Sequence, residues 1–222
     1  MNVRVRLINY SQDPEGRNLL EQIAYCARVS NPANQDNTET AEKLVRYLIK
    51  NKHWSPLEMV SVCLEIETTR DIARQILRRR SFSFQEFSQG YAVAEEFTNR
   101  ECRLQDNVNR QNSIELDVYG KDNDRHLATW WDQVQQRLSK EAEFLYQAAL
   151  NKGIAKEQAR ALLPEGLTVS RMYMNGTLRS WIHYLQIRCD KATQKEHRDV
   201  AEQCRDIIFE HFPSIKEVFN ED

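Results

Sequence analysis

A long helical pattern over residues 124–152 is the feature of the sequence that most constrains the fold. Gly153 follows this segment, and a glycine directly after the last helical residue is typical of a helix C-terminus. Three shorter segments in this half of the chain also carry helix signals, namely residues 155–162, 177–188 and 193–212. Residues 167–174 can form a strand between them. The C-terminal half is therefore predicted to be mainly helical.

The N-terminal half switches between strand and helix periodicity. Apolar residues alternate in residues 3–7 and 60–66, as expected for half-buried strands. They recur at helical spacing in three segments, which are residues 15–28, 41–50 and 69–78. Ser55-Pro56-Leu57-Glu58 predicts a short helical turn, because serine can cap it and proline suits its first position. Residues 81–122 have no lasting periodicity and are predicted to be a long loop.

These elements predict an α+β fold in which residues 1–222 form a single domain around one sheet. The net charge of -2 argues against a general attraction to nucleic acid or to an anionic membrane. No apolar run approaches the roughly 20 residues that cross a bilayer, and the N-terminus lacks the apolar stretch of a signal peptide. We therefore expect a cytoplasmic protein with neither nucleic acid nor membrane as a partner.

The cysteine, histidine and glycine patterns argue against several kinds of site. The five cysteines are widely spread without a CxxC pair, and the five histidines show no ligand spacing. Neither a disulfide framework nor a bound metal is expected. The six glycines form none of the standard nucleotide-binding loops. A nucleotide or nucleotide cofactor would have to be held in another way.

Residues 75–91 combine the triplet Arg78-Arg79-Arg80 with aromatic and polar side chains. Guanidinium groups bind phosphate through forked hydrogen bonds, and aromatic rings stack on bases. The aromatic residues are Phe82, Phe84, Phe87 and Tyr91, and the polar residues are Gln85, Glu86, Ser88 and Gln89. The combination indicates nucleotide binding. Two simpler explanations stay open: the arginines complement a helix C-terminus, and some phenylalanines belong to the core as strand residues.

The predicted helix 177–188 carries two neighbouring stripes that we interpret as polar. Ser180, Tyr184 and Arg188 share one stripe, and Arg179 and His183 share the other. Taken alone, a histidine here is equally a structural hydrogen-bonding residue. Arg179 one turn away favours the binding of an anionic or heteroaromatic ligand.

The spacing of Arg78-Arg79-Arg80, seven residues and Ser88 is the most specific pattern in the chain. It resembles the signature of flavin-dependent thymidylate synthases, which is Arg-His-Arg, seven residues and serine. Arg79 stands where that family usually has histidine, and Gly90 stands where it usually has arginine. Other segments similar to the family are Arg28-Val29-Ser30, His53-x-Ser55-x-x-Glu58, Ala73-Arg74-Gln75, Arg160 before Pro164, and Thr177-Leu178-Arg179 followed by His183 and Arg188.

The resemblance implies a central, mostly antiparallel sheet flanked by long helices, in a homotetramer whose subunits share active sites. It implies FAD as cofactor, NADPH and methylenetetrahydrofolate as co-substrates, and methylation of dUMP at C5 to dTMP. The implied nucleotide-binding residues are Gln75, Arg78, Glu86, Ser88, Gln89, Gly90, Arg160 and Arg188. The implied flavin-binding residues are Ser30, His53, Ser55, Glu58, Arg78, Arg79, Arg80, Glu86, Thr177, Arg179 and His183.

Arg188 is the catalytic residue that the resemblance implies. A pyrimidine C5 becomes nucleophilic when a nucleophile adds at C6 or when negative charge on the ring edge is stabilised. None of the five cysteines has an evident activating setting, and a guanidinium is permanently charged. Arg79 cannot shuttle a proton as histidine can, and Gly90 removes a charge. C5-hydroxymethylation of dUMP or dCMP therefore stays open as an alternative product.

Two further hypotheses also stay open. A single-stranded nucleic-acid binder would use the arginine triplet with the phenylalanines as stacking platforms, although it leaves Arg160, Arg179 and Arg188 unexplained. A flavin-binding relative that has lost activity is compatible with the altered signature.

Overall fold

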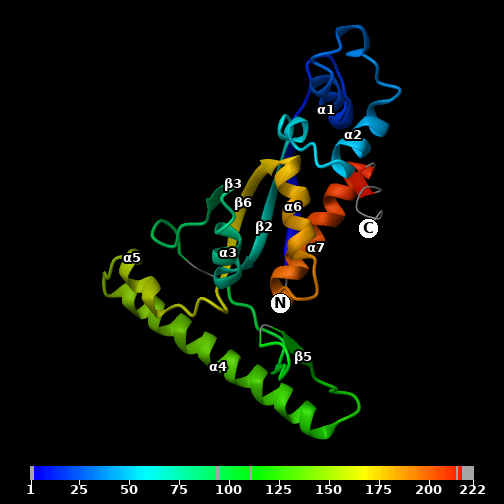
Figure 1. Cartoon of the computed structure of the whole chain (residues 1–222). Coiled ribbons are helices and arrows are strands. Elements are labelled where there is room, and N and C mark those ends of the chain that lie inside the picture. The colour runs from blue at the N-terminus through cyan, green and yellow to red at the C-terminus, as the bar shows by residue number, and fades with distance from the viewer. Residues whose placement is uncertain (1–2, 94–95, 111, 214, 217–222) are drawn as a thin grey trace.

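The computed structural model describes residues 3–93, 96–110, 112–213 and 215–216. Its centre is a four-stranded antiparallel sheet with the strand order β1-β2-β6-β3, and Figure 1 shows β3, β6 and β2 side by side. The strands are β1 (Arg4–Tyr10), β2 (Ser61–Thr69), β6 (Val169–Thr177) and β3 (Phe82–Glu86). The predicted α+β fold with an antiparallel sheet is confirmed. The strands expected at 3–7, 60–66 and 167–174 are present with shifted ends.

The main core lies on one face of this sheet. Met174 of β6 pairs with Leu64 of β2 on one side and with Phe84 of β3 on the other. Three helices pack on this apolar face (Figure 1): α3 (Arg70–Leu77), α6 (Leu178–Arg188) and α7 (Lys195–His211). Helix α6 begins one residue after its expected start, because the Thr177 side chain caps it by accepting a hydrogen bond from the Ser180 backbone N–H at 3.3 Å.

The other face of the sheet is polar, because successive side chains along a strand point to opposite faces. Arg6 and Glu65 are register partners there, and the guanidinium donates two hydrogen bonds to the carboxylate at 2.6 and 3.0 Å. Burial of Glu65 is nearly complete, at 5% exposure. The hydrogen bond from Arg6 lowers the pKa of Glu65, so the carboxylate stays charged in this setting.

Helices α1 (Leu19–Ala27) and α2 (Ala41–Lys50) lie together at one end of the sheet (Figure 1). Helix α2 has the predicted limits. Helix α1 begins later than residue 15 because Asn18 forms a capping box with Glu21, which fixes the first turn. Short 3-10 helices follow each of them, at Pro32–Asn34 and Ser55–Glu58. The second is the predicted short turn.

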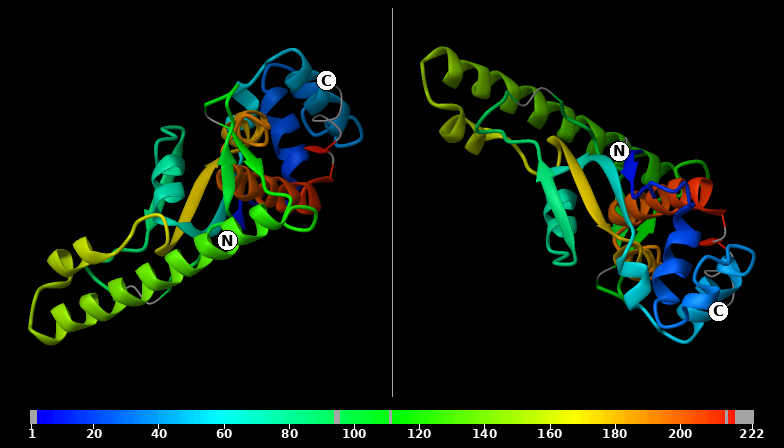
Figure 2. Two further views of the ribbon diagram at one scale, coloured as in Figure 1. Left: turned by 90° about the horizontal axis from the view of Figure 1, so that it is seen from below. Right: turned by 90° about the horizontal axis from the view of Figure 1, so that it is seen from above.

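Helix α4 (Asp122–Asn151) extends away from the sheet as a long arm (Figure 2). The chain reverses at Gly153, whose φ of 81° suits glycine, and returns along the arm through α5 (Lys156–Ala159) and a 3-10 helix (Arg160–Leu162). Tyr146, Ala149 and Leu163 belong to a second, small apolar cluster there. Among the residues that the structure describes, no helix is long and apolar enough to cross a membrane.

The prediction of an unbroken loop over residues 81–122 is wrong in part. The segment contains β3 and a two-stranded hairpin, β4 (Arg103–Gln105) and β5 (Ser113–Glu115). Phe82 is buried opposite Gly176 of β6, where the ring occupies the space that a Cβ would need. Strand β3 pairs with β6, which is about ninety positions away in the sequence, so the neighbouring residues carry little sign of it. The only local signal for a strand is the alternation of Phe82 and Phe84, and the sequence alone therefore did not distinguish β3 from a loop.

Candidate active site

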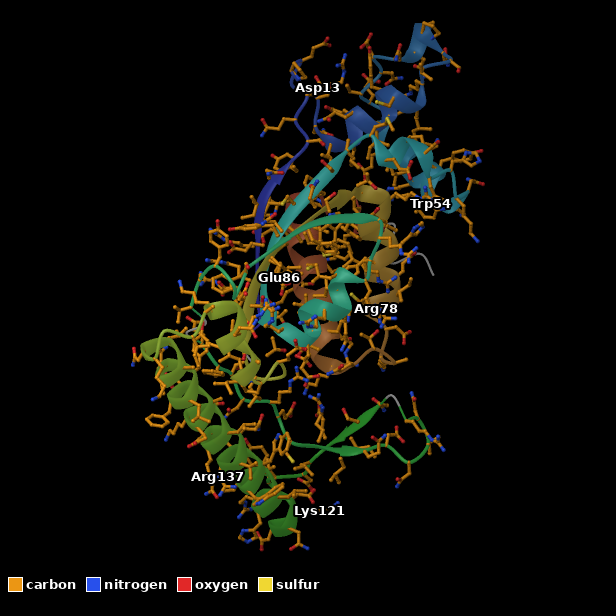
Figure 3. The ribbon with its side chains drawn as sticks, turned by 90° about the vertical axis from the view of Figure 1, so that its left-hand side faces the viewer. Asp13, Trp54, Arg78, Glu86, Lys121 and Arg137 are labelled. Atoms are coloured by element: carbon orange, nitrogen blue, oxygen red, sulfur yellow. The ribbon has the colours of Figure 1, made fainter. Side chains whose placement is uncertain are left out.

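The turn from α3 into β3 positions the arginine triplet. Ile72 and Ile76 bury one face of α3 completely. Arg78 is the C-cap residue, and Arg79 and Arg80 follow before β3 begins. Figure 3 shows Arg78 at the end of this helix. The carbonyl of Ser81 accepts a hydrogen bond from the Ser180 hydroxyl at 3.0 Å, so the turn is attached to the first turn of α6.

Arg188, at the C-terminal end of α6, forms a cluster of positive charge with Arg78 and Arg79 of this triplet. The Arg79 guanidinium lies 6.0 Å from the centroid of the Tyr184 ring, one turn before Arg188. Burial lowers the pKa of Arg188, and the charges of Arg79 and Arg78 lower it further. The Nε atom of Arg188 is buried without a hydrogen-bond partner in the described structure. A buried, unpaired donor among like charges is typical of a site that binds an anion.

A pocket of about 670 Å³ opens beside this cluster. Gln75, Arg188 and Gln194 are among the residues that line it. Asp190 is the one acidic residue among the described residues that line it, and it accepts a hydrogen bond from the Ala192 backbone N–H at 2.7 Å. The pocket thus combines the Arg188 guanidinium with amide and hydroxyl groups, which can donate hydrogen bonds to the oxygen atoms of a nucleotide.

The sequence did not reveal the hydrogen-bonded chain that runs behind this pocket. Gln75 donates from Nε2 to Oε1 of Gln194 at 2.9 Å, and its Oε1 lies 3.2 Å from Nδ1 of His197. Nε2 of His197 lies 3.2 Å from the Tyr184 hydroxyl. Gln194 and His197 are three residues apart at the start of α7, and this spacing is the signal that places both on one helix face.

Ser180 and Tyr184, which were interpreted as part of a polar stripe with Arg188, are buried. Ser180 is 9% exposed and Tyr184 is 2% exposed. The polar atoms of both residues are satisfied inside, by Ser81 and by His197. The side chains face the core because the Phe82 and Trp181 rings pack against Tyr184 in edge contacts.

Four of the eleven expected flavin-binding residues lie on or against the N-terminal half of α6, namely Thr177, Arg179, His183 and Glu58. Arg179 forms an ion pair with Glu58. The ring of His183 packs edge-on against Trp54 at a centroid distance of 4.5 Å. Thr177 caps the helix, whereas His53, Ser55 and Ser30 are exposed. Burial and the charge of Arg179 lower the pKa of His183, which favours a neutral ring.

The remaining expected nucleotide-binding residues lie at or beyond the opposite end of β3. Glu86 accepts a hydrogen bond from the Ser170 hydroxyl at 2.8 Å and faces Arg70 at 3.6 Å. Gln89 is buried, and its Nε2 has no partner in the described structure. Gly90 lies near Glu157, and Arg160 donates to the carbonyl of that residue at 3.1 Å. Ser88 is exposed in the same segment.

The structure therefore divides the expected site residues into separate groups. Strand β3 carries the chain about 13 Å from Phe82 to Glu86, at about 3.3 Å per residue. Figure 3 shows Arg78 and Glu86 on different segments, at the end of α3 and on β3. Arg78 and Arg188 lie together, but Ser88, Gln89 and Gly90 are not brought to them within one chain.

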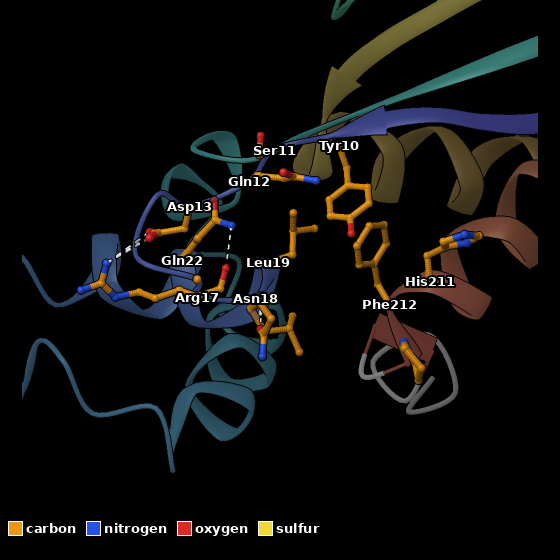
Figure 4. A pocket seen from close by; sticks show the side chains of 13 residues that line it. Tyr10, Ser11, Gln12, Asp13, Arg17, Asn18, Leu19, Gln22, His211 and Phe212 are labelled. Atoms are coloured by element: carbon orange, nitrogen blue, oxygen red, sulfur yellow. Dashed lines mark hydrogen bonds and ion pairs between the residues drawn. The ribbon is translucent and has the colours of Figure 1, made fainter.

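Another pocket, of about 480 Å³, lies between the end of β1 and the end of α7 (Figure 4). Its charged residues are already paired, since Arg17 contacts Asp13 and Asp36. Asn18 is occupied in capping α1. None of the expected site residues lines it. The described residues also contain no group of three or more acidic, histidine and cysteine side chains that could hold a metal ion.

In this antiparallel α+β fold, Arg188 lies near Arg78 and Arg79, and no ion pair of Arg188 is found among the described residues. The pocket beside it has a charge and shape suited to an anionic ligand. The family model for thymidylate synthase complementing protein matches residues 6–214. A flavin-dependent thymidylate synthase from Synechocystis sp. is 52% identical over 193 residues, which is 87% of this chain and 86% of the relative. The chain belongs to the thymidylate synthase complementing protein family.

Two further comparisons agree with this assignment. A probable flavin-dependent thymidylate synthase from Paramecium bursaria Chlorella virus 1 is 50% identical over 203 residues, covering 90% of this chain and 91% of the relative. The crystal structure of a UMP/dUMP methylase, PolB from Streptomyces cacaoi bound with 5-Br UMP, superimposes with a TM-score of 0.80 at 24% identity. It covers 98% of this chain and 93% of the other, so the two proteins share their fold.

Proposed function

We propose that the protein is a flavin-dependent thymidylate synthase, which converts dUMP to dTMP with FAD as cofactor and with methylenetetrahydrofolate and NADPH as co-substrates. Membership of the family and two relatives of that name, at 52% and 50% identity, support this proposal. The single structural observation that carries it is Arg188, whose buried Nε has no partner beside the pocket.

Arg188 acts in this proposal on the pyrimidine ring. Its guanidinium stabilises negative charge on the ring edge, which raises electron density at C5. The like charges of Arg78 and Arg79 keep the site electropositive, which favours an anionic substrate. Because no carboxylate of the described chain pairs with Arg188, its hydrogen-bonding capacity is available to the substrate.

The donor set at the start of α6 fits a flavin. Arg179, Thr177 and His183 offer hydrogen-bonding groups at one helix end, and Trp54 supplies an aromatic surface beside His183. The other residues that would hold FAD are Ser30, His53, Ser55, Glu58, Arg78, Arg79, Arg80 and Glu86. When bound, FAD supplies the hydride-transfer chemistry of the reaction. The residues of the chain bind it, orient it and set the charge around it.

Two copies of the chain would complete one active site, which accounts for the separation of the two nucleotide-binding groups. Gln75, Arg78 and Arg188 of one copy would face Ser88, Gln89, Gly90 and Arg160 of another. The long arm also carries exposed apolar side chains suited to burial between copies. They include Trp130, Leu138 and Phe144, at 56%, 49% and 67% exposure. A homotetramer with shared sites is the proposed assembly.

Gly90 leaves room near the nucleotide in this arrangement. A Cβ at this position would lie 3.7 Å from the Ser88 hydroxyl and 3.9 Å from Glu157, which are ordinary contact distances. Lys156, one residue before Glu157, donates to the Tyr91 carbonyl at 3.2 Å. The segment thus keeps a cation close by although position 90 has no side chain.

The reaction is tested with purified, FAD-loaded protein, dUMP, methylenetetrahydrofolate and NADPH, followed by mass analysis of the product. Formation of dTMP is expected. A 5-hydroxymethyl product, or turnover of dCMP in place of dUMP, would contradict the proposal. The Arg188→Ala protein, prepared in the same way, is the control for background chemistry.

Shared sites are tested by mixing two inactive variants. Arg188→Ala and Arg160→Ala alter opposite halves of the proposed site, so co-expression should restore activity in those sites that receive one intact half from each chain. Co-expression of Arg188→Ala with Gln75→Ala, both on the same half, should restore none. Equal results from the two mixtures would exclude shared sites.

A further inference from the structure

His197 is completely buried and is hydrogen-bonded on both sides of its ring. Its exposure is 0%, and its Nδ1 and Nε2 atoms each lie 3.2 Å from a polar atom, Oε1 of Gln75 and the hydroxyl of Tyr184. It was not among the residues expected to form the site. A buried histidine that touches a pocket-lining glutamine is in a position to control how that glutamine is oriented.

Glu196, at one end of this series of hydrogen bonds, determines the direction of each bond in the series. Glu196 is a buried carboxylate, which accepts hydrogen bonds from Arg103 and from Nε2 of Gln194, the latter at 2.9 Å. Burial raises the pKa of Glu196, but a backbone hydrogen bond and the hydrogen bonds from Arg103 and Gln194 outweigh it and lower this pKa overall, so the carboxylate is ionised and only accepts. The amide of Gln194 must therefore direct its nitrogen toward Glu196.

The remaining bonds are then determined in turn. Oε1 of Gln194 accepts from Nε2 of Gln75, at 2.9 Å, so Oε1 of Gln75 is left to face His197. Because this oxygen only accepts, Nδ1 of His197 must carry the proton. Nε2 of His197 then accepts from the Tyr184 hydroxyl.

Burial and neighbouring charges keep the imidazole neutral. Burial, together with the charges of Arg188 and Arg79, lowers the pKa of His197 to about 3. A protonated ring would also leave Nε2 as a donor facing the Tyr184 hydroxyl, whose oxygen would then have to accept. With the neutral Nδ1–H tautomer, every hydrogen bond in the series joins a donor to an acceptor.

We propose that His197 is a positioning residue, which holds the Gln75 amide with its oxygen turned inward and its nitrogen presented to the nucleotide pocket. Gln75 lines that pocket, and its second amide hydrogen has no partner among the described residues. The ligand atom it serves is an acceptor oxygen of the pyrimidine nucleotide, on the base or on the phosphate. This inference rests on the proposed function, because it assigns a role within the same site.

The first test measures binding of dUMP to the FAD-loaded protein by titration calorimetry. His197→Leu removes the donor to Gln75 and should weaken binding roughly five- to tenfold. His197→Asn keeps an N–H near the place of Nδ1 and should restore most of the affinity. In a Gln75→Ala background, His197→Leu should have no further effect.

The outcomes separate the inference from the function on which it rests. Wild-type protein that binds no dUMP overturns both. If the wild-type protein binds dUMP, but His197→Leu weakens binding equally with Gln75 present and in the Gln75→Ala background, only the inference about His197 is overturned. Deoxyuridine and dCMP serve as comparison ligands. If His197→Leu weakens binding of dUMP but not of deoxyuridine, which lacks the phosphate, Gln75 contacts the phosphate. If it weakens binding of dUMP and deoxyuridine but not of dCMP, Gln75 contacts the base.

The second test needs no variant at position 197. Nitrogen spectra of protein labelled with ¹⁵N-histidine distinguish the two neutral tautomers. The four other histidines, none of them buried, are assigned by substituting each in turn. The remaining ring should carry its proton on Nδ1, at neutral pH and unchanged in mildly acidic buffer. A proton on Nε2, or a doubly protonated ring, would overturn the inference.

Discussion

Arg100 donates from Nη2 to both carboxylate oxygens of Asp71, at 2.5 and 2.6 Å, and to the Thr69 hydroxyl at 2.8 Å. Its backbone carbonyl accepts hydrogen bonds from Trp131 and Gln135 of α4, each at 3.0 Å. One residue thus joins the long arm to the junction between β2 and α3. This contact is one of those that hold the arm to the rest of the fold, beside the hydrogen bond from Asn99 to Asp132 at 2.6 Å.

Arg100→Ala should lower the free energy of unfolding by about 2 kcal/mol, because it leaves a half-buried carboxylate without its charged donor. Urea unfolding measures the change. Arg125→Ala is the matched control, since Arg125 and Asp122 form an exposed ion pair on the same arm. That control should change stability by less than about 0.5 kcal/mol. Equal effects of the two variants would contradict the anchoring role.

Arg188→Ala should reduce kcat by about a thousandfold while leaving the fold intact. The side chain is half-buried among like charges, and its Nε has no partner among the described residues, so its removal should not lower the unfolding midpoint. Arg188→Lys keeps a charge but not the forked geometry, and it should recover only part of the activity. Arg74→Ala, on exposed α3 surface paired with Glu165, is the control and should remain active. Unchanged turnover of Arg188→Ala would remove Arg188 from its proposed role.

Arg179→Ala should weaken FAD binding roughly tenfold or more, because it removes a charged donor at the start of α6. Its ion pair with Glu58 is about 40% exposed on both sides, so stability should change by less than about 1 kcal/mol. Fluorescence titration of apoprotein with FAD measures the affinity. Arg205→Ala removes a similarly exposed pair with Asp206 and should leave FAD affinity unchanged. A large loss of stability with normal FAD binding would indicate a structural role for Arg179.

Local patterns predicted most of the helices and three strands of the main sheet. The limits of α2 were right because Ala41–Lys50 carries a clear apolar stripe, and α4 was found because its pattern is long and ends before Gly153. Strand β3 was ambiguous because its partner β6 is distant in sequence and its signal is short. The polar hairpin of β4 and β5 has no apolar periodicity at all.

The candidate site was predicted in parts but not in its arrangement. Local spacing and resemblance together named Arg78, Arg188 and Gln75, which the fold brings to one pocket region. Neither spacing nor resemblance revealed His197, because its partners come from α3 and α6 and only tertiary packing joins them. The separation of Ser88 from Arg78 likewise follows from the direction of β3, which is a property of the sheet.

The buried His197 makes stability depend on pH. In the unfolded chain its pKa returns to about 6.5, whereas in the folded protein burial and the charges of Arg188 and Arg79 lower its pKa to about 3. Below about pH 6.5 the unfolded chain therefore binds a proton that the folded chain does not. The free energy of unfolding should fall as the pH decreases from about 6.5 toward about 3, by up to about 1.4 kcal/mol per pH unit.

The comparison of wild type with His197→Asn isolates this contribution, since all other titrating groups are common to both proteins. Urea unfolding at about pH 7.5 and about pH 5.5 should show the wild type losing about 1.3 kcal/mol more than the variant between the two conditions. The wild type loses stability on acidification because folding lowers the pKa of His197. If folding instead stabilised the charged histidine, the wild type would gain stability relative to the variant. A wild-type gain, or parallel losses in the two proteins, would contradict a neutral buried imidazole at position 197.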